Sequence, residues 1–106
     1  MLSNTSGHAN TATGVSTLKL NSTGSNNTAY GANTLEANTA GSGNSVFGFW
    51  TMVNNTTGNS NVAVGTGALY SNTTLSNLVA IGDSALFYNG FGKCSGDFSS
   101  PRHCVL

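Results

Sequence analysis

Side chains able to carry out chemistry are few and scattered in this chain of 106 residues. The ionisable residues are His8, Lys19, Glu36, Asp83, Lys93, Asp97, Arg102 and His103. No two acidic residues share a position in the repeat described below, which argues against a hydrolase with paired carboxylates. The abundant serines and threonines have no base placed beside them by the pattern. We therefore expect a chain with no catalytic residue and no cofactor.

The remaining reactive residues are Cys94 and Cys104, close together near the C-terminus. Their separation suits a small local disulfide, which indicates an oxidising environment. Two free thiols are the alternative. Together with His103, the two cysteines could form a thiol site or contribute three ligands to a metal site. A disulfide or a loose tail is favoured over either site. We therefore expect no metal.

The composition excludes several classes of partner. Charged residues make up only 6% of the chain, and the absence of a basic cluster argues against nucleic acid. No apolar run approaches the roughly 20 residues of a membrane span, and residues 1–10 do not resemble a signal peptide. Because the formal net charge is zero, little electrostatic repulsion opposes association between copies of the chain.

A period of 17 residues runs through the sequence. One glycine column comprises Gly14, Gly31, Gly48, Gly65 and Gly82. An asparagine column comprises Asn4, Asn21, Asn38, Asn55, Asn72 and Asn89. A large apolar column comprises Met1, Leu18, Leu35, Met52, Leu69 and Leu86. A second glycine column comprises Gly7, Gly24, Gly41 and Gly58, is interrupted at Leu75 and returns at Gly92. Such a period predicts one structural unit repeated along an axis.

Each unit is too short for a pair of helices and carries strand-forming residues between its glycines. Residues 61–64 and 78–81 are predicted strands, and a second extended stretch is expected around each large apolar residue, for example over residues 68–71. The pattern predicts an all-β fold, a parallel β-solenoid with about five to six coils stacked roughly 4.8 Å apart. We assign residues 1–90 to the solenoid and residues 91–106 to a non-repetitive cap or subunit-joining segment.

Stacked coils place identical residues above one another, so the asparagine column predicts a ladder of side-chain amides. A second ladder is expected at Asn10, Asn27, Asn44 and Asn61, ending at Leu78. The alternative is that asparagines accept glycans, because the acceptor motif occurs at Asn4, Asn21, Asn26, Asn54, Asn55 and Asn72. We favour the ladders, since a repeat with Asn before Thr produces such motifs automatically.

The small core indicates an oligomer. Each coil has one large apolar residue, whose burial contributes about 1.5–3 kcal/mol, against an ordering cost of about 1.5 kcal/mol per residue. Both strand faces are apolar in the later coils, and one thin coil cannot bury both. We therefore expect a homo-oligomer, most simply of three chains around one axis.

The runs NVAVGTGAL at 61–69 and LVAIGDSAL at 78–86 resemble the head repeats of trimeric autotransporter adhesins, which carry an N-S-x-A-I-G-x-x-A type motif. With N-T-T-G between units, the repeat is also similar to stalks of phage and algal-virus tail fibres. The resemblance covers residues 6–90. It implies a left-handed parallel β-roll that is trimeric, non-enzymatic and used for surface display or attachment, and it transfers no binding residue.

The leading functional hypothesis is a structural protein of an extracellular, cell-surface or virion fibre, which binds copies of itself. Met1 already occupies the apolar column, so head-to-tail stacking into filaments is expected. The alternative is an adhesin or a glycan-binding fibre tip, in which aromatic residues stack on sugar rather than pack. These residues are Phe47, Phe49, Trp50, Tyr70, Phe87, Tyr88 and Phe91. A lesser alternative is ice binding by the Thr columns, one of which is broken by Ala40.

Overall fold

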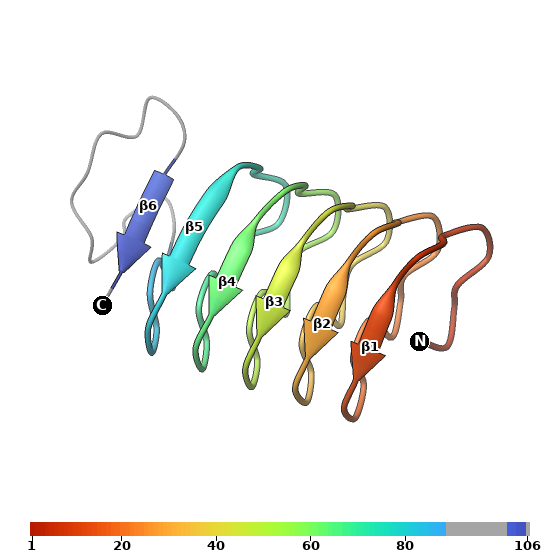
Figure 1. Cartoon of the computed structure of the whole chain (residues 1–106), viewed down its shortest axis with the longest axis horizontal. Coiled ribbons are helices and arrows are strands. Elements are labelled where there is room, and N and C mark those ends of the chain that lie inside the picture. The colour runs from red at the N-terminus through yellow and green to blue at the C-terminus, as the bar shows by residue number, and fades with distance from the viewer. Residues whose placement is uncertain (89–101, 106) are drawn as a thin grey trace.

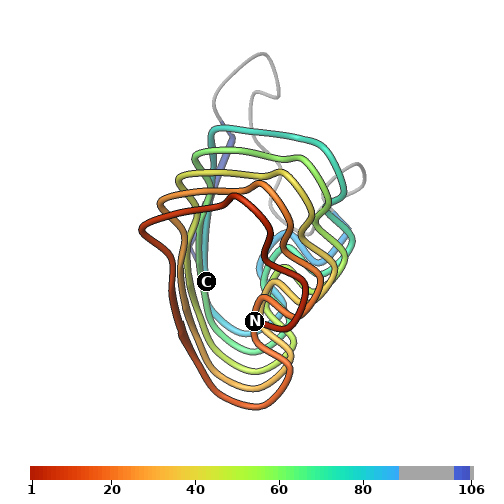
Figure 2. The same cartoon turned by 90° about the vertical axis from the view of Figure 1, so that its right-hand side faces the viewer.

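The computed structural model describes residues 1–88 and 102–105, which form a parallel β-solenoid (Figure 1). Six strands lie side by side in one sheet, in chain order. They are β1 (Thr11–Thr13), β2 (Thr28–Tyr30), β3 (Ser45–Phe47), β4 (Val62–Val64), β5 (Leu78–Ile81) and β6 (Arg102–Val105). All neighbours are parallel, and from β1 to β5 each residue pairs with the residue 17 positions on, as in Ala12 with Ala29. Figure 2 shows the coils as nested loops around one axis. The predicted fold class is confirmed.

Each coil has one strand rather than the two expected. Residues 68–71, predicted to be extended, are turns. The reason is a run of alternating positive φ after each strand, for example Gly14 at 127°, Ser16 at 58° and Leu18 at 48°. An extended strand requires negative φ throughout. The left-handed backbone conformation at these residues therefore turns this part of the coil inward instead of extending it.

The core is a narrow column inside the coils. The central residue of each strand points inward, so Ala29, Val46, Ala63 and Ala80 are buried, whereas their strand neighbours face outward. The large apolar column meets them from the opposite side of the coil. Its members Leu18, Leu35, Met52, Leu69 and Leu86 are buried, and Met1 is half exposed. Like side chains thus stack on like side chains along the axis.

The two glycine columns serve different purposes. Gly31 has a φ of +130°, and a Cβ there would lie 2.2 Å from the carbonyl oxygen of Gly48. Gly41 does not have a left-handed φ, but a Cβ would lie 2.4 Å from Asn38 Oδ1 and 2.5 Å from the oxygen of Gly58. The first column is required by both backbone conformation and space. The second is required only by close approach of the next coil.

The 17-residue register ends after β5. Leu78 pairs with Arg102 of β6, an offset of 24 residues. Leu75 occupies the second glycine column, where a Cβ would collide with a carbonyl of a coil stacked in the regular way. The break at Leu75 therefore marks the last regular rung. The predicted ladder member Asn89 and the predicted cysteine partner Cys94 lie outside the described residues.

Candidate functional site

The first asparagine column forms a continuous amide ladder on the inside of the coils. Asn21, Asn38, Asn55 and Asn72 each donate from Nδ2 to Oδ1 of the preceding member, at 2.8 Å in every case. The Nδ2 groups of Asn21, Asn38 and Asn55 also donate to a glycine carbonyl three residues on, at 2.9–3.1 Å. All four side chains are fully buried. The predicted ladder is present from Asn4 to Asn72.

The second predicted ladder, at Asn10, Asn27, Asn44 and Asn61, is also present. Asn44 accepts at Oδ1 from both the backbone N–H and the Nδ2 of Asn61, at 3.0 and 3.1 Å. Asn44 Nδ2 donates to the carbonyl of Gly58 at 2.9 Å. The same carbonyl also accepts from Asn55 Nδ2. The two ladders therefore meet at the second glycine column. At the end of this ladder, the backbone N–H of Leu78 donates to Asn61 Oδ1 at 2.9 Å.

A third ladder was missed by the sequence analysis. It lies in the column His8, Ser25, Ser42, Asn59 and Ser76, where each backbone N–H donates to the side-chain oxygen of the next member at 2.8–3.1 Å. His8 Nδ1 also lies 3.1 Å from Ser25 Oγ, so one hydroxyl does have an imidazole beside it, contrary to expectation. His8 is exposed and Ser25 is partly exposed, and the hydroxyl already accepts the His8 N–H. The pair is therefore part of the stacking pattern.

The threonine column considered for ice binding is bonded to the protein. Thr5, Ser22, Thr39 and Thr56 each donate their hydroxyl to the carbonyl 17 residues on, at 3.0–3.2 Å. Three consecutive N–H groups, of Ser22, Thr23 and Gly24, donate to the Thr39 carbonyl at 2.9, 3.0 and 3.3 Å. The exposed column beside it is interrupted at Ala40. These hydroxyls support stacking of the coils.

An aromatic run crosses the later coils on the turn side. Phe49 stacks on Trp50 with ring centroids 4.9 Å apart, and Tyr70 stacks on Phe87 at 4.5 Å with the rings nearly parallel. Trp50 lies 6.3 Å from Tyr70, and Tyr88 meets Phe87 edge-on at 4.8 Å. The rings therefore pack largely against one another along the solenoid axis. Phe47 lies apart, on the outward face of β3, and Phe91 is outside the described residues.

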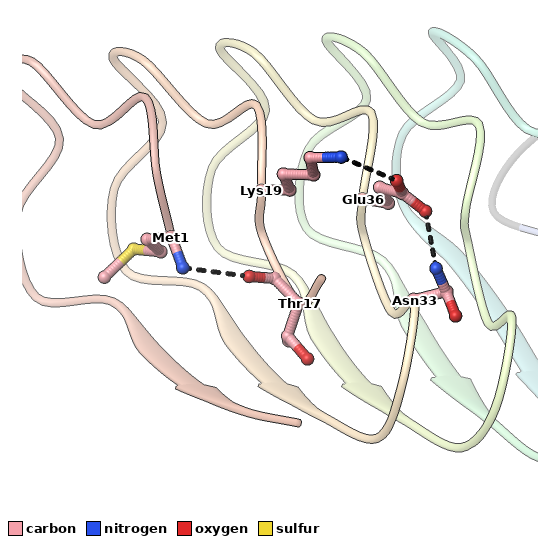
Figure 3. A network of polar contacts seen from close by, with 5 residues as sticks. All are labelled: Met1, Thr17, Lys19, Asn33 and Glu36. Atoms are coloured by element: carbon pink, nitrogen blue, oxygen red, sulfur yellow. Dashed lines mark hydrogen bonds and ion pairs between the residues drawn. The ribbon is translucent and has the colours of Figure 1, made fainter. Parts of the chain in front are cut away.

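In the earlier coils, some repeat positions of these aromatic residues hold polar or charged residues. Lys19 and Glu36 share the column of Tyr70 and Phe87, and Asn33 shares the column of Trp50. Figure 3 shows Lys19 Nζ 3.9 Å from Glu36 Oε1, and Asn33 Nδ2 donating to Glu36 Oε2 at 2.7 Å. The terminal ammonium of Met1 donates to the Thr17 carbonyl at 3.2 Å. The Lys19–Glu36 pair is partly exposed, so its contribution to stability is small, about 0–1 kcal/mol. This side of the solenoid thus changes from charged to aromatic along the axis.

Within the described residues, the outward face of β2 to β5 is partly or largely exposed and mostly apolar, with Thr28 and Ser45 as its polar members. Tyr30, Phe47, Val64 and Ile81 form one column of this face and are 59%, 42%, 36% and 37% exposed. No residue of β1 to β5 carries a formal charge. This face, which we call the outer sheet face, consists of the outward residues of β2 to β5. The inward packing of the strands leaves this face unused.

Neither metal coordination nor a membrane span is found in the part of the chain that the structure describes. Among the side chains that the structure describes, those of residues 1–88, no three His, Cys, Asp or Glu form a cluster suited to a metal ion. Nor does this part contain a helix long and apolar enough to cross a membrane. Every buried side-chain nitrogen and oxygen in the described residues has a hydrogen-bond partner.

No protein-family model matches the sequence, and no curated protein or solved structure matches it significantly.

Proposed function

We propose that this chain is a non-enzymatic structural protein, a β-solenoid subunit of an extracellular or virion-surface fibre. The observation that carries the proposal is the outer sheet face, which is uncharged, largely apolar and regular. The polar stacking supports the same view, because the two buried asparagine ladders and the third ladder at the surface all bond each coil to the next. These bonds stiffen the chain along its axis. Because its polar groups bond neighbouring coils, partners would contact mainly its outer surface.

A second copy of the chain is the partner that fits this face best. Contiguous exposed apolar patches on soluble proteins commonly mark interaction sites. The outward residues of this face repeat once per coil. A second copy of the chain has the same coil spacing, so the outward residues of the two copies can meet at every coil. No charged residue of β1 to β5 opposes such contact. Three chains around one axis, as the resemblance to adhesin heads implies, would shield this face from water, and end-to-end contact would lengthen the trimer into a filament.

The outer sheet face can be tested by one substitution and a matched control. Phe47→Asp places a charge in the centre of the face and should weaken self-association on the order of tenfold or more, since each 1.4 kcal/mol changes an equilibrium constant tenfold. Tyr88→Asp makes a similar change on the exposed aromatic side and should leave association unchanged. Sedimentation measures the mass, and circular dichroism verifies the fold. Equal association by all three proteins would refute this use of the face.

A glycan-binding fibre tip is the second candidate function. Phe49, Trp50 and Tyr88 are about half exposed or more, and sugar rings stack on exposed aromatic surfaces. The ring-to-ring stacking leaves less free face than an open platform, so this candidate ranks second. A glycan array probed with the chain and with Trp50→Ala separates the two: binding lost in the variant would favour the tip.

A further inference from the structure

The N-x-S/T motif for N-linked glycosylation occurs six times, and the structure divides these asparagines into two groups. Asn4, Asn21, Asn55 and Asn72 belong to the first ladder. Asn26 and Asn54 lie outside both asparagine ladders and are exposed. The motif alone does not distinguish the groups.

The buried ladder sites cannot carry a glycan in the folded chain. Asn55 uses both of its Nδ2 hydrogens, one to Asn38 Oδ1 at 2.8 Å and one to the Gly58 carbonyl at 3.1 Å. Replacing a hydrogen with a sugar removes one of these bonds. It would also place a bulky group where the side chain has no solvent access. The same argument applies to Asn21, which is bonded to Asn4 and Gly24, and burial excludes Asn72.

The two exposed sites have room for a glycan. Asn26 lies in the bend before β2, and its side chain makes no hydrogen bond within the described part of the chain. Asn54 lies in a turn and donates one Nδ2 hydrogen to the Tyr70 carbonyl at 3.0 Å. A glycosylated amide retains one hydrogen, so that bond can persist. Neither residue is in a strand, and glycans at these positions leave the strand residues of the outer sheet face unmodified.

We propose that Asn26 and Asn54 are N-glycan acceptor sites of this chain and that the buried ladder asparagines are excluded by the fold. The proposal rests on the extracellular location in the proposed function. The donor would be an oligosaccharide linked to a lipid through pyrophosphate. The bond between sugar C1 and the pyrophosphate oxygen breaks, Nδ2–C1 forms, and the amide proton leaves with the pyrophosphate. Transfer precedes folding, so a chain modified at Asn55 could not complete its ladder.

The experiment is secretion of the full chain, with a cleavable signal, from a eukaryotic host. Ser6→Ala silences the motif at Asn4 without changing the asparagine, and Ala40 in the same column shows that alanine fits. Peptide N-glycosidase converts each modified asparagine to aspartate, which peptide mass spectrometry locates in the secreted, folded protein. We expect modification at Asn26 and Asn54 and none at Asn21, Asn55 or Asn72.

Two further variants assign each glycan, using replacements that the repeat itself contains. Thr28→Val removes the motif at Asn26, and valine occurs naturally at the same repeat position in Val62 and Val79. Asn54→Ser removes the acceptor at position 54, and serine occurs naturally at the same repeat position in Ser71. Each should abolish one modification and leave the β-sheet circular dichroism unchanged. Absence of glycan at Asn26 and Asn54, or glycan at a buried ladder site in folded secreted protein, would overturn the proposal. Light scattering on the same sample tests self-association separately, so a glycosylated monomer would contradict only the structural function.

Discussion

Asn55 donates from Nδ2 to Asn38 Oδ1 at 2.8 Å, across one complete coil of 17 residues. The pair shows how the repeat specifies the fold. Each amide is a donor to one coil and an acceptor from the next, so a shift in register would leave buried polar groups unpaired. An unpaired buried group costs about 1–3 kcal/mol, and a shift would affect every rung. The ladder thereby fixes the stacking that exposes the outer sheet face.

Replacing Asn55 with Asp should destabilise the coil by about 1–3 kcal/mol or more. An aspartate cannot donate to Asn38 Oδ1 or to the Gly58 carbonyl, and its charge would be buried. The neighbouring exposed variant Asn54→Asp is the matched control and should change stability little. Thermal or urea unfolding gives both values. An unchanged transition in Asn55→Asp would show that the ladder does not hold the coils together.

The two kinds of glycine position should respond differently to alanine. Gly41→Ala places Cβ 2.4 Å from Asn38 Oδ1 and should destabilise the chain strongly, by about 3 kcal/mol or more. Gly43 has a φ of +68°, but its Cβ would have no neighbour closer than 3.6 Å. Gly43→Ala should therefore cost only about 1–2 kcal/mol from the left-handed backbone. Equal losses in urea unfolding would contradict the assignment of the second glycine column to close approach.

Deleting residues 91–106 should change assembly length without unfolding the coils. This segment includes β6, which pairs with β5 and covers its edge. Without β6, the β5 edge can pair with β1 of another copy, and exposed edges promote such pairing. Electron micrographs should then show longer particles, while circular dichroism reports the same strand signal per coil. If the truncated chain assembles as the full chain does, the tail is a dispensable cap.

The period, the parallel register and both asparagine ladders could be predicted because in-register stacking repeats residue identity. The third ladder was missed because its column is not uniform: its three serines are interrupted by Asn59 and preceded by His8. What Ser25 and Asn59 share is a side-chain acceptor placed beside a backbone N–H, and only the structure reveals that placement.

The turn around the large apolar column was also not predictable from local preference. Leucine disfavours positive φ, yet Leu35 and Leu69 have φ of 51° and 53°. Burial inside the coil outweighs that local preference at each repeat. The register of β6 was equally hidden, because after Asn89 and Gly92 the sequence no longer follows the columns, and β6 pairs at an offset of 24 residues.

Self-association of the chain, which we propose occurs through the outer sheet face, can be measured by light scattering of the purified protein. A dilution series should give the mass of three chains, or of larger multiples if trimers stack end to end. A uniform monomer at every concentration, with the β-sheet signal intact, would contradict the proposal.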